Sequence, residues 1–162
     1  MDRAARIAWL VDHARRLQHL RAPADADIRL AGGNPGCGDV ITVHLKADAG
    51  ADRVAAVSFV GSGCTLSRAA ASVLAEVTNR GHPTFAEVER FAEEAMLELV
   101  GRDVAEARPR CATLALDTLK TAVKVLAMDR MLTAAGHSAA EIAALRSALT
   151  AATSPGPAPA QG

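Results

Sequence analysis

The spacing of apolar residues changes once along this chain, and that change limits the folds open to it. Between residues 40 and 60 apolar side chains recur at every second position, whereas from Leu66 onward they follow the 3.6-residue period of an α-helix. A helical pattern also precedes these segments, over Arg3–Leu20. A run of strands followed by a run of helices predicts an α+β fold: an N-terminal helix, a small three-stranded antiparallel sheet, and a C-terminal set of helices on one face.

Three short segments carry the strand signals. Val40–Lys46 alternates apolar and polar residues, and Val54–Val60 repeats the pattern less regularly. The Asp48–Gly50 turn between them predicts an antiparallel hairpin. Ile28–Ala31 is the third predicted strand, and the Gly-rich segment Gly32–Gly38 that follows it is predicted to be a loop.

Capping and breaking residues divide the C-terminal half into four predicted helices. Thr84 with Glu87 has the spacing of a capping box, and Ser138 with Glu141 marks the start of the last helix. In the second helix the apolar pattern predicts four inward residues, Val88, Phe91, Ala95 and Leu99. The four predicted helices are Leu66–Gly81, Thr84–Gly101, Cys111–Gly136 and Ser138–Thr150.

The length predicts one domain and a tail. The chain has 162 residues, of which 50% are hydrophobic, and this is enough to bury a core without disulfide bonds. We expect a single domain over residues 1–150. Residues 151–162 are rich in Pro, Ala and Gly, a composition that favours disorder. Three cysteines cannot all pair with one another, which favours reduced thiols available for metal or sulfur chemistry.

Composition disfavours several classes of function. Lys plus Arg and Asp plus Glu number 18 each, and only 2% of residues are aromatic, so we expect no nucleic-acid partner. No apolar run reaches the roughly 18 residues that cross a membrane, and no secretory signal is evident. We therefore expect a cytoplasmic protein with no membrane partner. The motifs of P-loop, dinucleotide-binding, serine-hydrolase and zinc-protease sites are absent as well.

Every cysteine lies at a junction between predicted elements. Cys37 lies between two glycines just before a strand, and Cys64 lies where a strand turns into a helix. Cys111 starts another helix, next to Arg108 and Arg110. A helix N-terminus lowers the pKa of a thiol, so the thiolate is favoured at Cys64 and Cys111, and the two guanidinium groups should favour it further at Cys111. The alternative for each cysteine taken alone is a small buried hydrophobic residue.

Other polar residues are weaker candidates. Asp39 is two positions from Cys37 and can complete a tetrahedral set of three thiolates and a carboxylate, or it can be a turn residue that binds its own backbone. Arg110 is a candidate fourth-position or anion-steering group, with an ordinary surface arginine as the alternative. None of the five histidines lies near a cysteine in sequence: His13, His19, His44, His82 and His137.

Three segments together resemble the family of U-type iron–sulfur cluster scaffolds, which includes the NifU N-terminal domain, IscU and SufU. The family's Asn-Pro-x-Cys-Gly-Asp matches Asn34–Asp39, and its Gly-x-Gly-Cys-x-x-Ser-x-Ala-x-x-Ser matches Gly61–Ser72. Its last cysteine, in Cys-Ala-x-Leu, matches Cys111–Leu114. The similarity runs from Ile7 to Val125 and includes the Asp12–His13 pair.

The resemblance implies a small α+β fold whose three cysteines converge at one exposed end. Members accept sulfur from a cysteine desulfurase, assemble a transient 2Fe-2S cluster and pass it to recipient apoproteins, and they also bind Zn²⁺ or Fe²⁺. Such a scaffold or carrier is not an enzyme in the usual sense, and any activity would be that of a sulfurtransferase. The implied metal and cluster ligands are Cys37, Asp39, Cys64 and Cys111, with Cys37 and Cys111 as candidate persulfide acceptors.

Two departures from the family pattern suggest a divergent member. One branch has a histidine just before the last cysteine and a Leu-Pro-Pro-Val-Lys chaperone-binding segment upstream. Here Ala105–Arg110 reads AEARPR, which argues against the histidine ligand and against an Hsp70-type chaperone partner. The SufU branch tolerates a basic residue there but carries an insertion, for which the interval from Cys64 to Cys111 is too short. In chemistry the chain is nearer to SufU.

Three hypotheses follow from these residues. The first is a scaffold that holds a cluster transiently on its three cysteines and Asp39. The second is a sulfur carrier, in which zinc occupies the same residues until one cysteine leaves the metal and accepts persulfide. The third is a structural zinc domain that acts as an interaction module.

Overall fold

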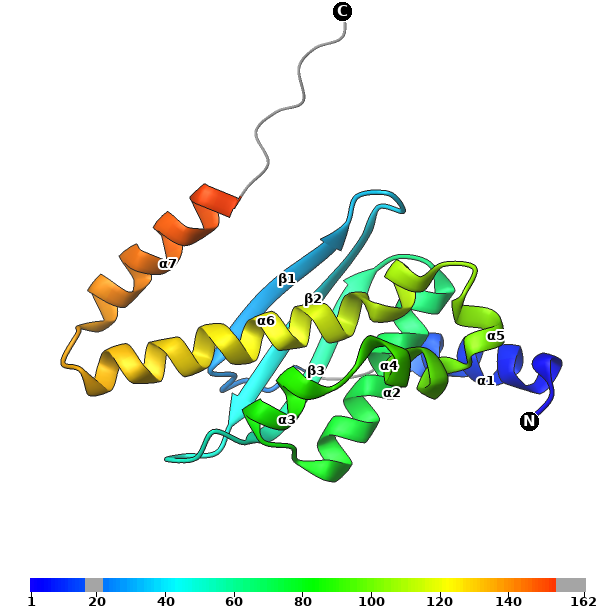
Figure 1. Cartoon of the computed structure of the whole chain (residues 1–162), viewed down its shortest axis with the longest axis horizontal. Helices are drawn as coiled ribbons and strands as arrows, with labels where there is room; N and C mark the ends of the chain where they lie inside the picture. Colours follow the sequence, from blue (N-terminus) through cyan, green and yellow to red (C-terminus); the bar gives the residue numbers. More distant parts are fainter. Residues whose placement is uncertain (17–21, 154–162) are drawn as a thin grey trace, which may run out of the picture. The chain divides into compact units, whose positions relative to one another are not determined.

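The computed structural model describes residues 1–16 and 22–153 (Figure 1). Its elements follow the predicted order, with a helix, three strands and then helices, so the α+β prediction is confirmed. The predicted N-terminal helix is present over Arg3–Arg16, and its last predicted turn lies outside the described residues. The elements are α1 Arg3–Arg16, β1 Ile28–Asn34, β2 Asp39–Ala47, β3 Val54–Ser62, α2 Thr65–Gly81, α3 Phe85–Arg90, α4 Glu93–Val100, α5 Arg102–Ala105, α6 Pro109–Ala134 and α7 Ala139–Thr153.

The three strands form one antiparallel sheet in the order β1-β2-β3. Its inner face carries the alternating apolar residues of β2, because Ile41, Val43 and Leu45 are completely buried. The β1–β2 hairpin closes at the pair Asn34 and Asp39, so residues 35–38 form its turn. This turn carries the first predicted cysteine at one end of the sheet.

The predicted loop over Gly32–Gly38 is wrong in its first half. Residues 32–34 continue β1 and pair with β2 through to Asp39. The two strands of a hairpin must match in length to close on a short turn. β2 begins at Asp39, so β1 continues through the glycines that follow its apolar residues in order to pair with it. Gly32 also has a packing reason to lack a side chain, because a Cβ there would lie 2.0 Å from Thr118 Oγ1 of α6.

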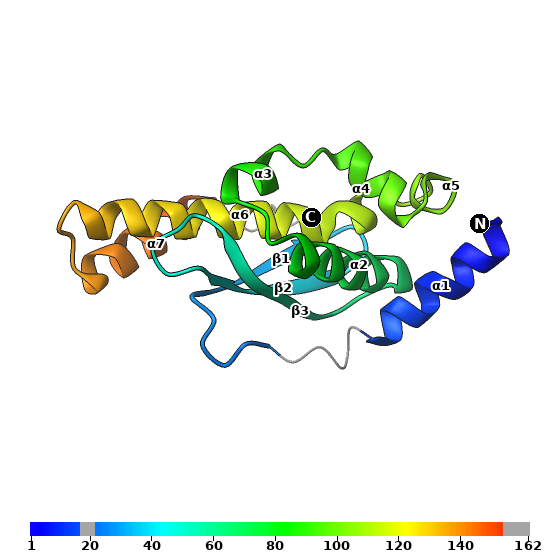
Figure 2. The same cartoon turned by 90° about the horizontal axis from the view of Figure 1, so that it is seen from below.

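Helices cover the inner face of the sheet (Figure 2). α2 packs mainly against β3, and α6 passes over β1 at Gly32. α1 packs on α2, where the Arg68 guanidinium donates to the Ala14 carbonyl oxygen and His13 Nδ1 lies 3.1 Å from Ser72 Oγ. The prediction that helices after the sheet pack on one of its faces is thereby confirmed for α2 and α6.

The predicted helix over Thr84–Gly101 is in fact two helices, α3 and α4. The capping box of Thr84 and Glu87 is present, but the chain becomes extended at Phe91 and Ala92. Met96 and Val100 are the buried residues of α4, whereas the predicted Ala95 is exposed and Leu99 is half-buried. An unbroken helix would turn Met96 by about 80° away from the buried Val88, so the break lets both helices face the core.

The chain divides into two compact units, Met1–Leu126 and a second unit that begins at Ala127. In the second unit the end of α6 and α7 form a helical hairpin, in which Arg146 pairs with the buried Asp129 carboxylate. The capping box of Ser138 and Glu141 begins α7 as predicted. The single domain over 1–150 stays a prediction, and the predicted tail lies largely outside the described residues.

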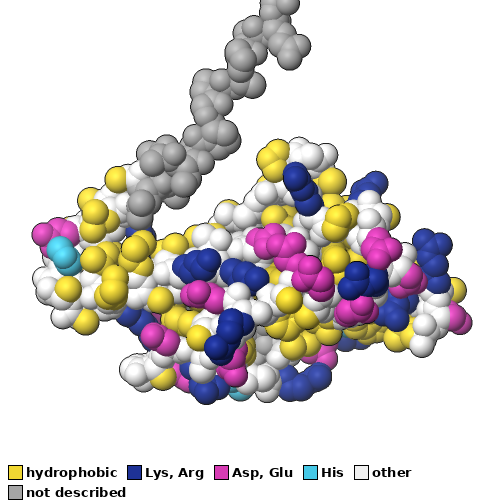
Figure 3. Space-filling view, viewed as in Figure 1, with side chains coloured by type: hydrophobic (Ala, Val, Ile, Leu, Met, Phe, Trp, Pro, Cys, Tyr) yellow, Lys and Arg dark blue, Asp and Glu magenta, His cyan; other side chains and the backbone are white. Residues whose placement is uncertain are grey.

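The surface is of mixed charge. On the face seen in Figure 3, basic and acidic side chains lie interspersed among apolar ones. In the described part of the chain, none of the helices is long and apolar enough to cross a membrane.

Candidate metal and sulfur centre

The hairpin turn between β1 and β2 presents Cys37 to solvent. The amide N–H groups of Cys37 and Gly38 both donate to the Asn34 carbonyl oxygen, at 3.1 and 2.9 Å. Gly38 has φ +68°, a left-handed conformation that a residue with a Cβ rarely adopts. The glycine of the motif therefore shapes the turn, and the Cys37 side chain is exposed at its tip.

Asp39 follows the turn but its side chain is only 1% exposed. Its Oδ1 accepts a hydrogen bond of 2.8 Å from the Cys64 N–H at the far edge of the sheet. Burial acts to raise the pKa of Asp39, but the hydrogen bond from the Cys64 N–H and the nearby Cys111 and Cys64 thiols and Ser67 hydroxyl outweigh it and lower the pKa overall. Oδ1 thus binds the N-cap residue of α2, and Asp39 is not a turn residue bound to its own backbone.

Cys64 is the N-cap of α2. Its Sγ accepts from the Ser67 N–H at 3.4 Å, and it is half-buried. The preceding glycine makes room for the buried carboxylate, because a Cβ on Gly63 would lie 2.6 Å from Asp39 Oδ1. The predicted junction of strand and helix is confirmed, and it brings Cys64 next to Asp39.

Cys111 lies in the first turn of α6 and is 1% exposed. Its Sγ–H donates to Cys37 Sγ at 3.4 Å, and Asn34 Nδ2 donates to Cys111 Sγ at 3.6 Å. The predicted thiolate at this position is wrong for the metal-free protein. Burial, followed by hydrogen bonds with Cys37, Asp39 and Cys64, raises the pKa of the Cys111 thiol well above its usual range.

The two arginines that were expected to favour that thiolate lie on the surface. Arg108 and Arg110 are both exposed. Arg110 lines a polar hollow of about 300 Å³ beside the site. The other residues of that hollow are Gly33, Asn34, Pro35, Glu93, Thr113, Leu114 and Asp117. Arg110 is therefore a neighbour of the site, and its role as a fourth-position or anion-steering group stays a prediction.

Three of the four predicted ligands form one cluster. The ligand atoms of Cys37, Asp39 and Cys111 all lie within 4.8 Å of one another. Cys64 is not part of that cluster, although its thiol interacts with both Asp39 and Cys111. One sulfur is exposed and one is buried, so the cluster opens to solvent at the Cys37 side.

The carboxylate of Asp39 has an oxygen available for a ligand. Oδ2 is buried and has no hydrogen-bond partner among the described residues, whereas Oδ1 is held by the Cys64 N–H. A buried acceptor without a partner is costly, and a cation would satisfy it. Thiolate sulfur and carboxylate oxygen are suitable ligands for zinc or iron. The residues present thus fit a metal, with Asp39 binding through a single oxygen.

The histidines in the described residues do not join the cluster. His13 and His44 are buried in the fold, and His82 and His137 are exposed near helix ends. His19 lies outside the described residues. Sequence reasoning missed two polar residues of the site, Asn34 and Ser67. Both lie inside the matched motifs, so the signal was available, but only the fold shows which sulfur each one contacts.

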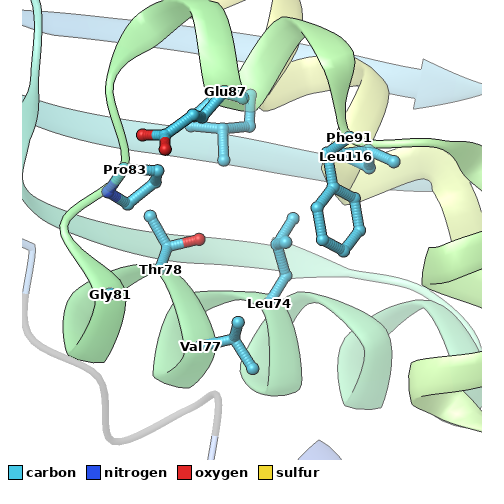
Figure 4. Close-up of a pocket in the computed structure, with 10 residues that line it drawn as sticks. Leu74, Val77, Thr78, Gly81, Pro83, Glu87, Phe91 and Leu116 are labelled. Carbon is cyan, nitrogen blue, oxygen red and sulfur yellow. The ribbon is translucent and has the colours of Figure 1, made fainter.

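A second cavity, of about 250 Å³, lies away from the cysteines (Figure 4). It is enclosed mainly by apolar side chains of α2, α3 and α6, including Leu74, Phe91 and Leu116. None of the predicted site residues lines it, so it has no part in the metal centre.

The protein has a three-stranded sheet flanked by helices, and thiols and one carboxylate lie together at one end of it. Fold and site together are those of a small α+β protein that offers sulfur and oxygen ligands to a metal. The sequence matches the NifU-like N terminal domain over residues 11–131. This chain therefore belongs to that family, and the resemblance inferred from the motifs is confirmed.

One relative is similar in sequence, and two solved structures are similar in fold. The iron–sulfur cluster assembly scaffold protein IscU of Streptococcus pyogenes serotype M1 is 29% identical over 142 residues, which is 78% of this chain and 87% of the relative. FiSufU of Fervidobacterium islandicum AW-1 has a similar fold, with a TM-score of 0.53, 21% identity, and coverage of 71% of this chain and 93% of the other. The N-terminal part of a nitrogen-fixing NifU-like protein from Brucella abortus has a TM-score of 0.57 and 21% identity, covering 72% and 90%.

Proposed function

We propose that this chain is a scaffold for iron–sulfur cluster assembly. In this proposal it accepts sulfur from a cysteine desulfurase, assembles a labile 2Fe-2S cluster and transfers it to recipient apoproteins. The observation that carries the proposal is the cluster of Cys37, Asp39 and Cys111, whose ligand atoms lie within 4.8 Å of one another. We propose Cys64 as the fourth ligand, because its N–H binds Asp39 Oδ1 at 2.8 Å and its thiol contributes to the pKa shifts of Asp39 and Cys111.

The ligand set suits a cargo that must be released. Three thiolates bind iron or zinc strongly, whereas one carboxylate oxygen is a harder ligand that holds a cluster less firmly. Asp39 can offer Oδ2 to the metal while its Oδ1 keeps the hydrogen bond from the Cys64 N–H. The site is exposed to solvent at Cys37, and a recipient protein can reach the cluster from this side.

Cys37 is the better of the two candidate persulfide acceptors. A desulfurase carries its sulfur on a cysteine of its own, so the acceptor thiol must be reachable by another protein. Cys37 is exposed at the tip of a hairpin, whereas Cys111 is 1% exposed behind it. Cys111 therefore acts as a ligand and a neighbour of the acceptor rather than as the first acceptor.

The same exposure supports the alternative of a zinc-bound sulfur carrier. In that role Zn²⁺ or Fe²⁺ is held by the four residues, and Cys37 leaves the metal to accept the sulfur. The structural zinc module, which needs no exposed ligand, is less well supported by a cysteine at a hairpin tip. We place the protein in the cytoplasm, with a desulfurase and apoproteins as its partners and without an Hsp70-type chaperone.

Anaerobic reconstitution separates these functions. The full chain is mixed with a cysteine desulfurase, cysteine and Fe²⁺, and the visible spectrum, the metal content and the thiol masses are recorded. A chromophore that an apoferredoxin can remove supports the scaffold. Persulfide on Cys37 without a chromophore supports the carrier. If neither appears and removal of metal unfolds the chain, both proposals are wrong.

Variants test the ligand set in the same assay. Cys37→Ser, Cys64→Ser and Cys111→Ser should each lower the bound metal per chain, and a variant with full occupancy would remove that cysteine from the site. Asp39→Asn is the matched control for folding, because its amide oxygen can still accept from the Cys64 N–H. It should keep the stability of the wild type more closely than Asp39→Ala does, while binding metal more weakly.

A further inference from the structure

The contact between Cys111 and Cys37 places a second thiol directly behind the proposed acceptor. Cys111 Sγ lies 3.4 Å from Cys37 Sγ, which is close to van der Waals contact for two sulfurs. Cys37 is exposed and Cys111 is buried, so one sulfur faces solvent and the other lies on its protein side. Metal binding requires only that both sulfurs reach the metal. In the metal-free protein the same contact places the two sulfurs close enough to react with each other.

We propose that Cys111 is a resolving thiol that releases the sulfur loaded on Cys37 as sulfide. This inference rests on the proposed function, because a desulfurase must first convert Cys37 into a persulfide. Cys111 Sγ then attacks Cys37 Sγ, a bond forms between these two sulfurs, and the bond from Cys37 Sγ to the added sulfur breaks. The persulfide and the Cys111 thiol become a disulfide and hydrogen sulfide.

Atoms and electrons balance in this step without another reactant. The sulfane sulfur gains two electrons and leaves as sulfide, and the two cysteines together lose two electrons as they join. The proton of the Cys111 thiol passes to the departing sulfur. A dithiol reductant then restores both thiols before the next cycle. The chain itself therefore supplies the electrons for one turnover.

Geometry favours attack on the inner sulfur over transfer to Cys111. Thiol–disulfide exchange requires the attacking sulfur, the attacked sulfur and the leaving sulfur to lie in line. An added sulfur is delivered from outside and extends from Cys37 toward solvent, away from the buried Cys111. Cys111 Sγ thus faces Cys37 Sγ from the side opposite the leaving sulfur.

Two neighbours hold Cys111 in this position. Asn34 Nδ2 donates to Cys111 Sγ at 3.6 Å, and its carbonyl oxygen accepts from the Cys37 N–H at 3.1 Å. Asn34 therefore contacts both cysteines of the pair, Cys111 at its sulfur and Cys37 at its backbone. The Asp39 carboxylate is the second neighbour, because one of its oxygens lies within 4.8 Å of both sulfurs.

A single-turnover experiment tests the inference. The metal-free full chain is mixed anaerobically, without reductant, with a cysteine desulfurase that carries persulfide and has been freed of cysteine. Sulfide is measured by colour formation, and the chain is examined by intact mass and peptide mapping. We expect about one sulfide per disulfide formed, with Cys37 and Cys111 in the linked peptide. A mock reaction with persulfide-free desulfurase controls for oxidation and should leave three free thiols.

Replacement of Cys111 distinguishes this inference from the proposed function. Cys111→Ser and Cys111→Ala should keep the persulfide on Cys37, about 32 Da heavier than the free thiol, and release at least about tenfold less sulfide. Circular dichroism shows whether each variant is folded. Persulfide that stays on Cys37 of the wild type, or that moves to Cys111, overturns the inference and leaves the scaffold intact. Absence of persulfide and disulfide from wild type and variants alike overturns both.

Discussion

The packing of α6 against β1 determines where Cys111 lies. Gly32 permits this close packing because it has no side chain. A Cβ at position 32 would lie 2.0 Å from Thr118 Oγ1 and 3.1 Å from Thr118 Cβ. The next residue is a matched control, since Gly33 faces the opposite side of the same strand and its Cβ would meet nothing closer than 3.8 Å. Both substitutions, Gly32→Ala and Gly33→Ala, add one methyl group to β1. Only the methyl group at position 32 overlaps with α6.

The expected size of the effect follows from these contacts. Thr118 Oγ1 must rotate away from a Cβ at position 32, which breaks its 2.7 Å hydrogen bond to the Leu114 carbonyl oxygen and costs about 1 kcal/mol. The remaining overlap with Thr118 Cβ adds roughly 1–2 kcal/mol of overpacking. Removal of glycine returns about 0.4–1 kcal/mol through the unfolded chain, at either position. We expect Gly32→Ala to lose about 2 kcal/mol overall and Gly33→Ala to be neutral or slightly stabilised.

Urea unfolding followed by circular dichroism measures the two free energies, and zinc titration measures the site. Because α6 carries Cys111, its displacement should weaken zinc binding in folded Gly32→Ala and not in Gly33→Ala. Equal stability and equal zinc affinity of the two variants would refute the reasoning that close packing of β1 on α6 positions the site.

Three further predictions concern the supports of the fold. Asn79→Ala removes two 2.8 Å hydrogen bonds, one that its Oδ1 accepts from the Val57 N–H and one that its Nδ2 donates to the Val57 carbonyl oxygen, and should cost about 1–3 kcal/mol in urea unfolding; unchanged stability would mean that water replaces the amide. Burial, and then the nearby Arg16, lowers the pKa of His13 below its usual 6.5, so the unfolded chain binds more protons and the free energy of unfolding should fall as the pH drops below 6.5. His13→Gln should reduce that slope, and the buried His44, whose pKa is also lowered, should account for part of the remainder; an unaltered slope would exclude His13. Arg146→Ala leaves the carboxylate of Asp129, a residue that is 8% exposed, without its cation. We expect amide hydrogen exchange in α7 to become about tenfold faster. Arg102→Ala, which breaks an exposed ion pair with Glu98, should change exchange little.

Much of the fold follows from local sequence. The alternation in β2, the capping boxes at Thr84 and Ser138, and the apolar stripe of α6 each specify an element without help from the rest of the chain. The extension of β1 into its glycines and the break between α3 and α4 do not follow from local pattern. Both depend on partners distant in sequence, namely the pairing with β2 and the need to bury Met96.

The sequence predicts which residues form the site, but it does not predict the direction in which the pKa of Cys111 is shifted. The motifs identify Cys37, Cys64 and Cys111, and the fold brings the first and last of them to within 3.4 Å across 74 positions. Helix position and nearby arginines predict a thiolate at Cys111. Burial reverses that expectation in the metal-free protein, because the charged form loses its water while Arg108 and Arg110 are exposed on the surface. A sequence shows which residues are adjacent along the chain but not how deeply a side chain is buried.

Zinc K-edge X-ray absorption of the metal-loaded full chain tests the central claim that Cys37, Asp39, Cys64 and Cys111 form one metal site. The claim predicts four ligands, with three sulfurs at about 2.3 Å and one oxygen at about 2.0–2.2 Å. In Asp39→Ala the three sulfurs should remain and the oxygen should be replaced by water or lost. A first shell made of nitrogen and oxygen alone, or one with only two sulfurs that Cys64→Ser leaves unchanged, would contradict the claim.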